Sequence, residues 1–178
     1  VRSGPYGVEA INDLVAQRLF PVKTTSDGGL EAPRKDWMRN KALFYDHRVI
    51  MITRNDYDMR LFNGDVGVIL PKGNTGGELQ AWFEGEGEGE FRNLPCSLLP
   101  EHETAFAMTI HKSQGSQFRD VLLLLPPRDS PVLTRELIYT GLTRASGNVA
   151  IWCDGGIFAQ AAARGVGRST GLCGWLAN

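Results

Sequence analysis

The chain has 178 residues, of which 42% are hydrophobic and 22% are charged, and its formal net charge at pH 7 is −1. This length and composition predict a globular protein with one sizeable core, or one core and a small inserted module, and exclude a histone-like binder that holds nucleic acid by bulk charge. The longest apolar run, residues 121–125, is too short for a membrane span, and no secretory signal precedes it. We therefore expect an intracellular, cytoplasmic protein.

The charge is unevenly distributed along the chain. Lys and Arg against Asp and Glu give a net charge of +3 for residues 1–54, −7 for 55–108 and +3 for 109–178. Any contact with nucleic acid must therefore come from a local groove. The cysteines and histidines show no metal-ligand spacing, so no zinc site is expected. These residues are Cys96, Cys153, Cys173, His47, His102 and His111.

The first elements are a turn-rich start over residues 1–7 and an amphipathic helix. The abrupt start suggests a piece of a longer protein. Apolar residues then recur at helical spacing until Pro21 ends the pattern, which predicts a helix with one face packed on a sheet. These residues are Val8, Ile11, Leu14, Val15 and Leu19. The polar segment 23–36 is typical of an exposed loop.

The next segment favours short antiparallel strands. Four runs rich in β-branched and apolar residues are separated by Gly- and Asn-containing turns, which predicts a small barrel over about residues 41–100. The runs are residues 48–54, 66–70, 79–83 and about 90–94. The Gly-Glu repeat at 84–90 is better explained as a solvated hairpin tip than as a cation site, since alternating glycines make a poor rigid cage.

After Pro100 the pattern changes to alternating strands and helices. We predict a strand at 104–110, a polar loop, a strand at 121–125, a helix at about 134–145, a strand at 148–153 and a short helix at about 158–163. Such alternation indicates an α/β domain with a mainly parallel sheet. The buried stripe of the 134–145 helix should comprise Leu137, Ile138, Gly141, Leu142 and Ala145.

The polar loop, Thr109-Ile-His-Lys-Ser-Gln-Gly-Ser-Gln-Phe118, is the strongest candidate for a functional site. In open α/β sheets, ligands bind where loops leave the carboxyl ends of strands. The loop is rich in hydrogen-bond donors, and its backbone can approach a ligand closely at Gly115, which suits phosphate oxygens. The alternative is a polar connection that caps the next element. Arg144 also has two interpretations. It is either a functional residue or, like many arginines near a helix C-terminus, only a favourable partner of the helix dipole.

Thr109–Phe118 and Tyr139-Thr-Gly-Leu-Thr-Arg-Ala145 together resemble motifs V and VI of superfamily 1 helicases. The resemblance extends to Gly4-Pro-Tyr-Gly-Val8 with Asn12, to Leu61-Phe-Asn-Gly-Asp-Val-Gly-Val68 and to Leu99-Pro-Glu-His-Glu103. In these segments the chain is similar to the C-terminal part of the RecD family. Members of this family are the alpha subunits of exodeoxyribonuclease V, a bacterial recombination-repair helicase and nuclease.

The resemblance implies a second RecA-like motor domain, of the P-loop NTPase type, formed by residues 1–40 and 101–178 (domain 2A). An SH3-like small barrel at 41–100 (2B) would be inserted in it. Such motors move 5′ to 3′ on single-stranded DNA by hydrolysing ATP, which lies between two RecA-like domains. The first of these domains supplies the phosphate loop and the Mg2+-binding carboxylates. This chain contains no Gly-x-x-x-x-Gly-Lys-Ser/Thr sequence, so we expect it to be inactive alone.

The resemblance also assigns residues to the nucleotide. Arg144 would be the arginine finger that meets the γ-phosphate, because a planar, permanently charged guanidinium stabilises charge spread over a transferring phosphoryl group. Gln114 and Gly115 would approach the nucleotide, and Gln117 its ribose. Many relatives have glutamate where this chain has Gln117, and a basic residue where it has Ser146. Neither departure removes the arginine finger.

A second group would face the DNA. Thr109 and His111 would donate hydrogen bonds to the phosphates or sugars of single-stranded DNA, which fix its position without reading its sequence. Lys112 is a further DNA candidate, with a solvated lysine as the alternative. A loop that contacts both ligands would let the bound nucleotide change the affinity for single-stranded DNA.

The expected partners are single-stranded DNA, the N-terminal RecA-like domain, and RecB- and RecC-type subunits, one of which would carry the nuclease. Two alternatives remain open. One is a non-catalytic module in which the barrel binds DNA or a protein, and the other is part of a stand-alone RecD-like helicase.

Overall fold

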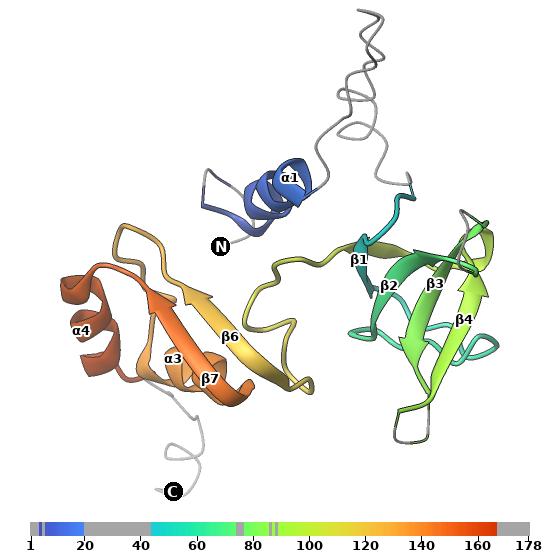
Figure 1. Ribbon diagram of the computed structural model, residues 1–178. Helices are drawn as coiled ribbons and strands as arrows, with labels where there is room; N and C mark the ends of the chain where they lie inside the picture. The colour runs from blue at the N-terminus through green and yellow to red at the C-terminus, as the bar shows by residue number, and fades with distance from the viewer. Residues whose placement is uncertain are drawn as a thin grey trace, which may run out of the picture. The chain divides into compact units, whose positions relative to one another are not determined.

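The computed structural model describes residues 4, 6–19, 44–73, 77–85, 87 and 89–166. The predicted loop at 23–36 and Cys173 lie outside these residues. In chain order the elements are α1 (Val8–Leu19), β1 (Val49–Ile52), β2 (Val66–Pro71), β3 (Leu79–Glu84), β4 (Phe91–Pro95), the 3-10 helix η1 (Cys96–Leu98), β5 (His102–Thr104), β6 (Phe118–Leu124), α3 (Arg135–Leu142), β7 (Ala145–Trp152) and α4 (Gly155–Ala163) (Figure 1). In this described part, no helix is long and apolar enough to cross a membrane.

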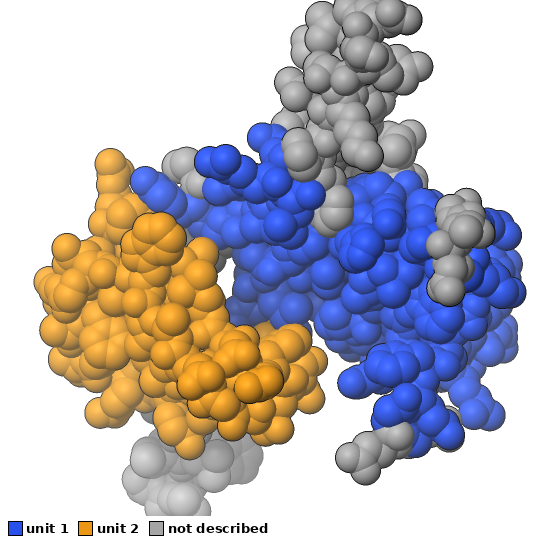
Figure 2. Space-filling model, in the orientation of Figure 1, with its two compact units in different colours: residues 1–112 blue, residues 113–178 orange. Residues whose placement is uncertain are grey.

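The chain forms two compact units, residues 1–112 and 113–178 (Figure 2). The division falls between Lys112 and Ser113, inside the polar loop that the sequence marks as a functional candidate. Each unit contains both helix and strand, in keeping with the predicted α/β class. The narrower domain limits, 1–40 with 101–178 and 41–100, stay a prediction.

The first unit is built on a five-stranded antiparallel sheet with the strand order β4-β3-β2-β1-β5. Four of its strands confirm the runs predicted between residues 48 and 94. β3 and β4 are joined by the Gly-Glu repeat, so the predicted hairpin is also confirmed. The core of the sheet comprises the buried residues Ile50, Ile52, Leu61, Ile69, Ala81 and Phe83. An SH3-like barrel remains our interpretation of this sheet.

The strand predicted at 104–110 is wrong. β5 spans only His102–Thr104, and it pairs antiparallel with β1 instead of joining a parallel sheet. The reason lies in Asn12, whose amide nitrogen donates to the carbonyl oxygens of Thr104 at 3.1 Å and Ala107 at 3.0 Å. Its amide oxygen accepts from the backbone N–H of Ala107 at 2.8 Å. One side chain thus satisfies backbone groups that a strand would pair with a neighbouring strand.

Helix α1 forms where its apolar periodicity predicts it, but the buried face differs. Asn12 and Ala16 are buried, whereas Leu14 and Leu19 of the predicted stripe are 58% and 59% exposed. Val8, Ile11 and Val15 are half-buried, so the predicted apolar face is only partly turned inward, and Asn12 and Ala16 form its most buried part. Asn12 turns inward because its hydrogen bonds to residues 104 and 107 offset the cost of burying an amide.

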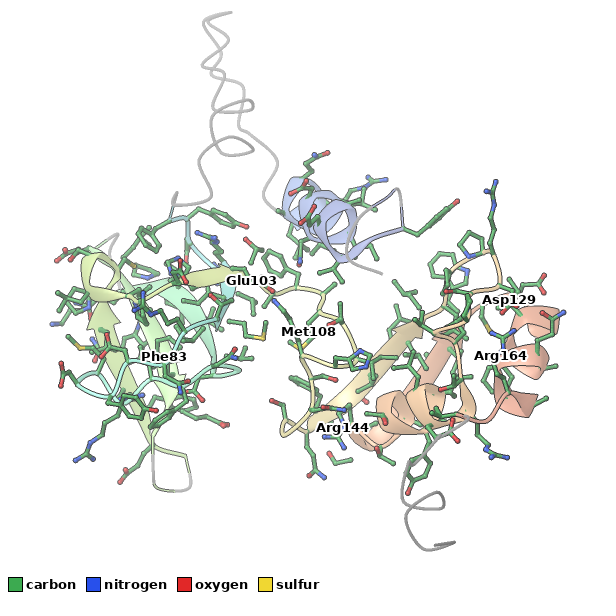
Figure 3. All side chains as sticks on the ribbon, turned by 180° about the vertical axis from the view of Figure 1, so that it is seen from behind. Phe83, Glu103, Met108, Asp129, Arg144 and Arg164 are labelled. Carbon is green, nitrogen blue, oxygen red and sulfur yellow. The ribbon has the colours of Figure 1, made fainter. Side chains whose placement is uncertain are left out.

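The second unit contains a parallel pair of strands, β6 and β7, with helices α3 and α4. The two strands and the two helices confirm the elements predicted after residue 118. In α3, Ile138 and Gly141 of the predicted stripe are buried, and Leu137 and Leu142 are half-buried. The helix ends at Leu142, so the prediction that it extends to Ala145 is wrong, and Ala145 begins β7. Arg164 follows α4 and forms an ion pair with Asp129 at 2.6 Å (Figure 3), which ties the loop after β6 to the end of α4.

The first unit should become less stable as the pH falls. His102 stacks on Phe44 and its Nδ1 lies 2.7 Å from the Pro100 carbonyl oxygen. Burial lowers the pKa of His102, and Arg48 lowers it further against the opposing effect of the Pro100 carbonyl. Below about pH 6.5 the unfolded chain therefore binds a proton that the folded chain resists, so the free energy of unfolding decreases as the pH falls.

Urea unfolding followed between pH 7.5 and 5.5 measures this effect. The free energy of unfolding should be constant above about pH 6.5 and fall below it. His102→Asn should flatten the decline, because an amide can still donate to Pro100 but does not titrate. An unchanged decline in this variant would assign the pH dependence to other groups.

Candidate functional site

The first half of the polar loop is a turn that follows β5. The backbone N–H of Lys112 donates to the Thr109 carbonyl oxygen at 3.0 Å, and the Thr109 hydroxyl oxygen lies 3.3 Å from the same N–H. Thr109 and Lys112 are half-buried, and His111 between them is exposed. The turn therefore presents the imidazole of His111 to solvent.

Lys112 carries the strongest contact of this half. Its Nζ lies 2.6 Å from Oε1 of Glu103 on β5, and the two side chains are 35% and 29% exposed. The ammonium is thus paired with a carboxylate while remaining accessible from solvent. The sequence predicts that Lys112 is either solvated or DNA-binding, and it does not indicate Glu103 as a partner.

The second half of the loop is another turn, closed by a hydrogen bond from the N–H of Ser116 to the carbonyl oxygen of Ser113 at 3.1 Å. Gly115 has a φ of +93°, a backbone conformation that a side chain rarely tolerates. No other atom lies within 4 Å of the position where a Cβ would be, so the glycine is required by the backbone angle and not by crowding. Gln114, Gly115 and Gln117 are exposed and available to a ligand.

Arg144 joins this second turn to the end of α3. Helix α3 begins at its N-cap Thr134, whose hydroxyl accepts from the N–H of Leu137 at 3.2 Å, and Arg144 directly follows the C-cap Thr143. The guanidinium donates to the carbonyl oxygen of Ser116 at 3.2 Å, to that of Thr140 at 3.1 Å and to the hydroxyl of Thr143 at 3.3 Å (Figure 3).

The backbone of Arg144 reinforces this arrangement. Its carbonyl oxygen accepts from the N–H of Phe118 at 2.8 Å, where β6 begins beside β7. A guanidinium has five N–H donors, and the three side-chain bonds use three of them. The half-buried Arg144 is therefore held in place, and its other donors take no part in these bonds.

The seven predicted site residues divide between the two units. Thr109, His111 and Lys112 belong to the first unit, and Gln114, Gly115, Gln117 and Arg144 belong to the second. Within the second unit, the turn at 113–116 and Arg144 are brought together by the Ser116 hydrogen bond. The roles assigned to these residues stay predictions.

Asn12 and Glu103 lie in segments that carry the family resemblance, but the sequence assigns neither residue a role in positioning the loop. Glu103 gives no signal by itself, since its partner Lys112 comes close only through the fold. Asn12 does leave a signal, because Val8, Asn12 and Ala16 lie at successive helical positions and a polar residue interrupts an apolar stripe. Among the described residues, no three His, Cys, Asp or Glu side chains are grouped so as to hold a metal ion.

This chain is similar to RecD subunits and to DNA helicases. Residues 104–152 match the UvrD-like helicase C-terminal domain family. The RecBCD enzyme subunit RecD of Haemophilus influenzae is 37% identical over 172 residues, which is 97% of this chain and 23% of that protein. RecD of Mycobacterium tuberculosis is 43% identical over 129 residues, covering 72% of this chain and 22% of that protein. This chain belongs to the RecD family.

This RecD-family chain spans about a quarter of the length of its curated relatives. The ATP-dependent RecD2 DNA helicase of Deinococcus radiodurans is also similar, with 29% identity over 85% of this chain and 20% of that protein. Among solved structures, a Bacteroides Pif1 helicase in complex with ADP-AlF3 and single-stranded DNA matches 61% of this chain and 29% of its own, with a TM-score of 0.41 and 18% identity.

Proposed function

We propose that this chain is part of an ATP-dependent 5′-3′ DNA helicase subunit of the RecD type that acts in the recombination repair of double-strand breaks. In this proposal it forms the second RecA-like motor domain with an inserted SH3-like barrel. It supplies an arginine finger and contacts to single-stranded DNA. The phosphate loop and the Mg2+ ligands come from the N-terminal RecA-like domain, and RecB- and RecC-type subunits complete the assembly.

The observation that carries the proposal is the hydrogen bond between Arg144 and the carbonyl oxygen of Ser116. It joins the only residue of the site with a permanent, planar positive charge to the glycine-containing turn that precedes β6. The chain's own donors suit a triphosphate, because the guanidinium keeps free N–H groups and Gly115 lets a phosphate approach the backbone.

The division of the loop suggests how ATP and DNA communicate in this proposal. ATP, when bound, supplies the phosphoryl group whose transfer drives movement. Gln114, Gly115 and Gln117 contact the nucleotide and Arg144 stabilises its γ-phosphate. Thr109, His111 and Lys112 contact the DNA backbone. Lys112 and Ser113 are joined by one peptide bond. In this proposal, a shift of the turn at 113–116 on nucleotide binding is therefore transmitted along the chain to the turn at 109–112, which contacts the DNA.

Titration of fluorescent oligo(dT) and mixed-sequence single strands with the full-length protein tests DNA binding. We expect binding that weakens steeply with salt and differs little between the two sequences, because phosphate contacts dominate. Lys112→Gln should weaken binding and lower the salt slope by about 0.7. The matched control Lys72→Gln removes the same charge from an exposed site and should leave binding unchanged. Absence of salt-sensitive binding by the native protein would contradict the helicase proposal and favour a protein-interaction module.

A further inference from the structure

We propose that Glu103 limits the grip on single-stranded DNA by competing with the DNA phosphate for the Lys112 ammonium. This inference rests on the proposed function, since it assumes that Lys112 contacts DNA. It gives a role to Glu103, which the sequence marks only as the last residue of the segment Leu99–Glu103. Glu103 is a positioning residue in this scheme, because it acts through Lys112 and not on the DNA itself.

The ion pair has the geometry that such competition requires. Nζ of Lys112 and Oε1 of Glu103 are 2.6 Å apart, so one of the three donors of the ammonium is engaged by a carboxylate oxygen. Both side chains are about one-third exposed, which leaves the pair open to an incoming phosphate. An ion pair that is one-third exposed is weak enough for the ammonium to exchange the carboxylate for another anion.

Glu103 is the fixed partner of the pair. It lies at the centre of β5, opposite Met51 of β1, and its two neighbours are anchored on the strand. The His102 ring stacks on Phe44 with 5.5 Å between ring centroids. The Thr104 hydroxyl accepts from Nε of Arg48 at 3.2 Å, and the Thr104 carbonyl accepts from Asn12. The backbone of Glu103 is therefore fixed, and its side chain, shorter than that of Lys112, limits how far the carboxylate can follow the ammonium.

Lys112 is the mobile partner. Its backbone is held by the turn at 109–112, but its four-carbon stem allows the ammonium to move without changing that turn. On DNA binding the ammonium exchanges the Glu103 carboxylate for a phosphate, so the gain is the difference between two similar interactions. A motor that must release the strand in every cycle benefits from a contact of this kind, because release restores the internal ion pair.

Single-stranded DNA binding by Glu103→Gln in the full-length helicase tests the inference. Glutamine keeps the size of the side chain but removes the competing charge. At low salt, the affinity for oligo(dT) should rise about three- to fivefold, and the salt slope should steepen by no more than about 0.7, the contribution of one phosphate. In a Lys112→Gln background, Glu103→Gln should have no effect.

Glu101→Gln is the matched control, since it removes the same charge from an exposed residue two positions earlier. An equal rise in affinity in this control would reduce the effect to general electrostatics and overturn the proposal. Weaker binding by Glu103→Gln, unchanged binding, or a rise that persists without Lys112 would also overturn it. If the native protein does not bind DNA, the proposed function fails, and this inference fails with it. If the native protein binds and only the Glu103 effect is missing, the proposed function stands.

Discussion

If the proposed function holds, replacing Arg144 with alanine in the full-length protein should slow DNA-stimulated ATP hydrolysis by about a hundredfold or more, with ATP and DNA binding retained. Our proposal places the guanidinium at the γ-phosphate, where negative charge is spread over the transferring group. An interaction of this kind is strongest in the transition state, so its loss lowers turnover and leaves substrate binding nearly unchanged. Turnover measured at saturating DNA, with binding of both ligands measured alongside, gives the comparison.

The contacts of Arg144 decide which controls this experiment needs. From the sequence alone we expect Arg144→Ala to leave the fold intact, because the residue lies outside the buried stripe of α3. The structure gives the side chain three hydrogen bonds, which together contribute about 1–2 kcal/mol when partly exposed. The alanine variant should therefore fold with reduced stability, and a thermal unfolding curve must accompany the kinetics.

Two further variants separate chemistry from structure. Arg144→Lys keeps a positive charge but loses the planar fork, so turnover should remain at least about tenfold below that of the native protein. Thr143→Val removes one contact of the guanidinium while keeping Arg144, and it should reduce turnover only slightly. Turnover within about threefold of the native value in Arg144→Ala would mean that the arginine only ends the helix and complements its dipole.

The strands of the five-stranded sheet were predictable because each one carries its own signal. The core side chains of residues 50, 52, 69, 81 and 83 follow the alternation of a strand, and glycine-containing turns separate the runs. The same local reasoning failed at 104–110. That segment has the composition of a strand, but Asn12, more than ninety residues earlier, bonds its backbone groups. A local pattern contains no information about such a distant partner.

The candidate site shows the same limit. The composition of the loop at 109–118 and the position of Arg144 after a helix are visible in the sequence. The positive φ that requires glycine at position 115 is visible only in the structure. The pairing of Lys112 with Glu103 is not, because it depends on the path of the chain between β5 and the turn. Nor does spacing predict that the Arg144 side chain bonds the Ser116 carbonyl, since 28 residues separate the two.

Asn12 is a buried polar residue of the first unit whose replacement should be strongly destabilising. In Asn12→Asp, a carboxylate replaces the amide that donates to the carbonyl oxygens of Thr104 and Ala107. Asn12 is 6% exposed, so the new charge would be buried facing two oxygens. Losing two hydrogen bonds and burying an unpaired charge should lower the free energy of unfolding by about 3 kcal/mol or more. Urea unfolding of the variant and the native protein measures this difference.

The same substitution should also affect the residues that we propose contact DNA. Asn12 fixes residues 104 and 107, and the chain then reaches Thr109, His111 and Lys112 with no further strand to guide it. Asn12→Asp should therefore also weaken single-stranded DNA binding at temperatures where the protein is still folded. Gln17→Glu makes the same chemical change at an exposed position of the same helix and should alter neither property. If Asn12→Asp proves as stable as Gln17→Glu, α1 does not hold the segment in place, and the loop must be positioned by β5 alone.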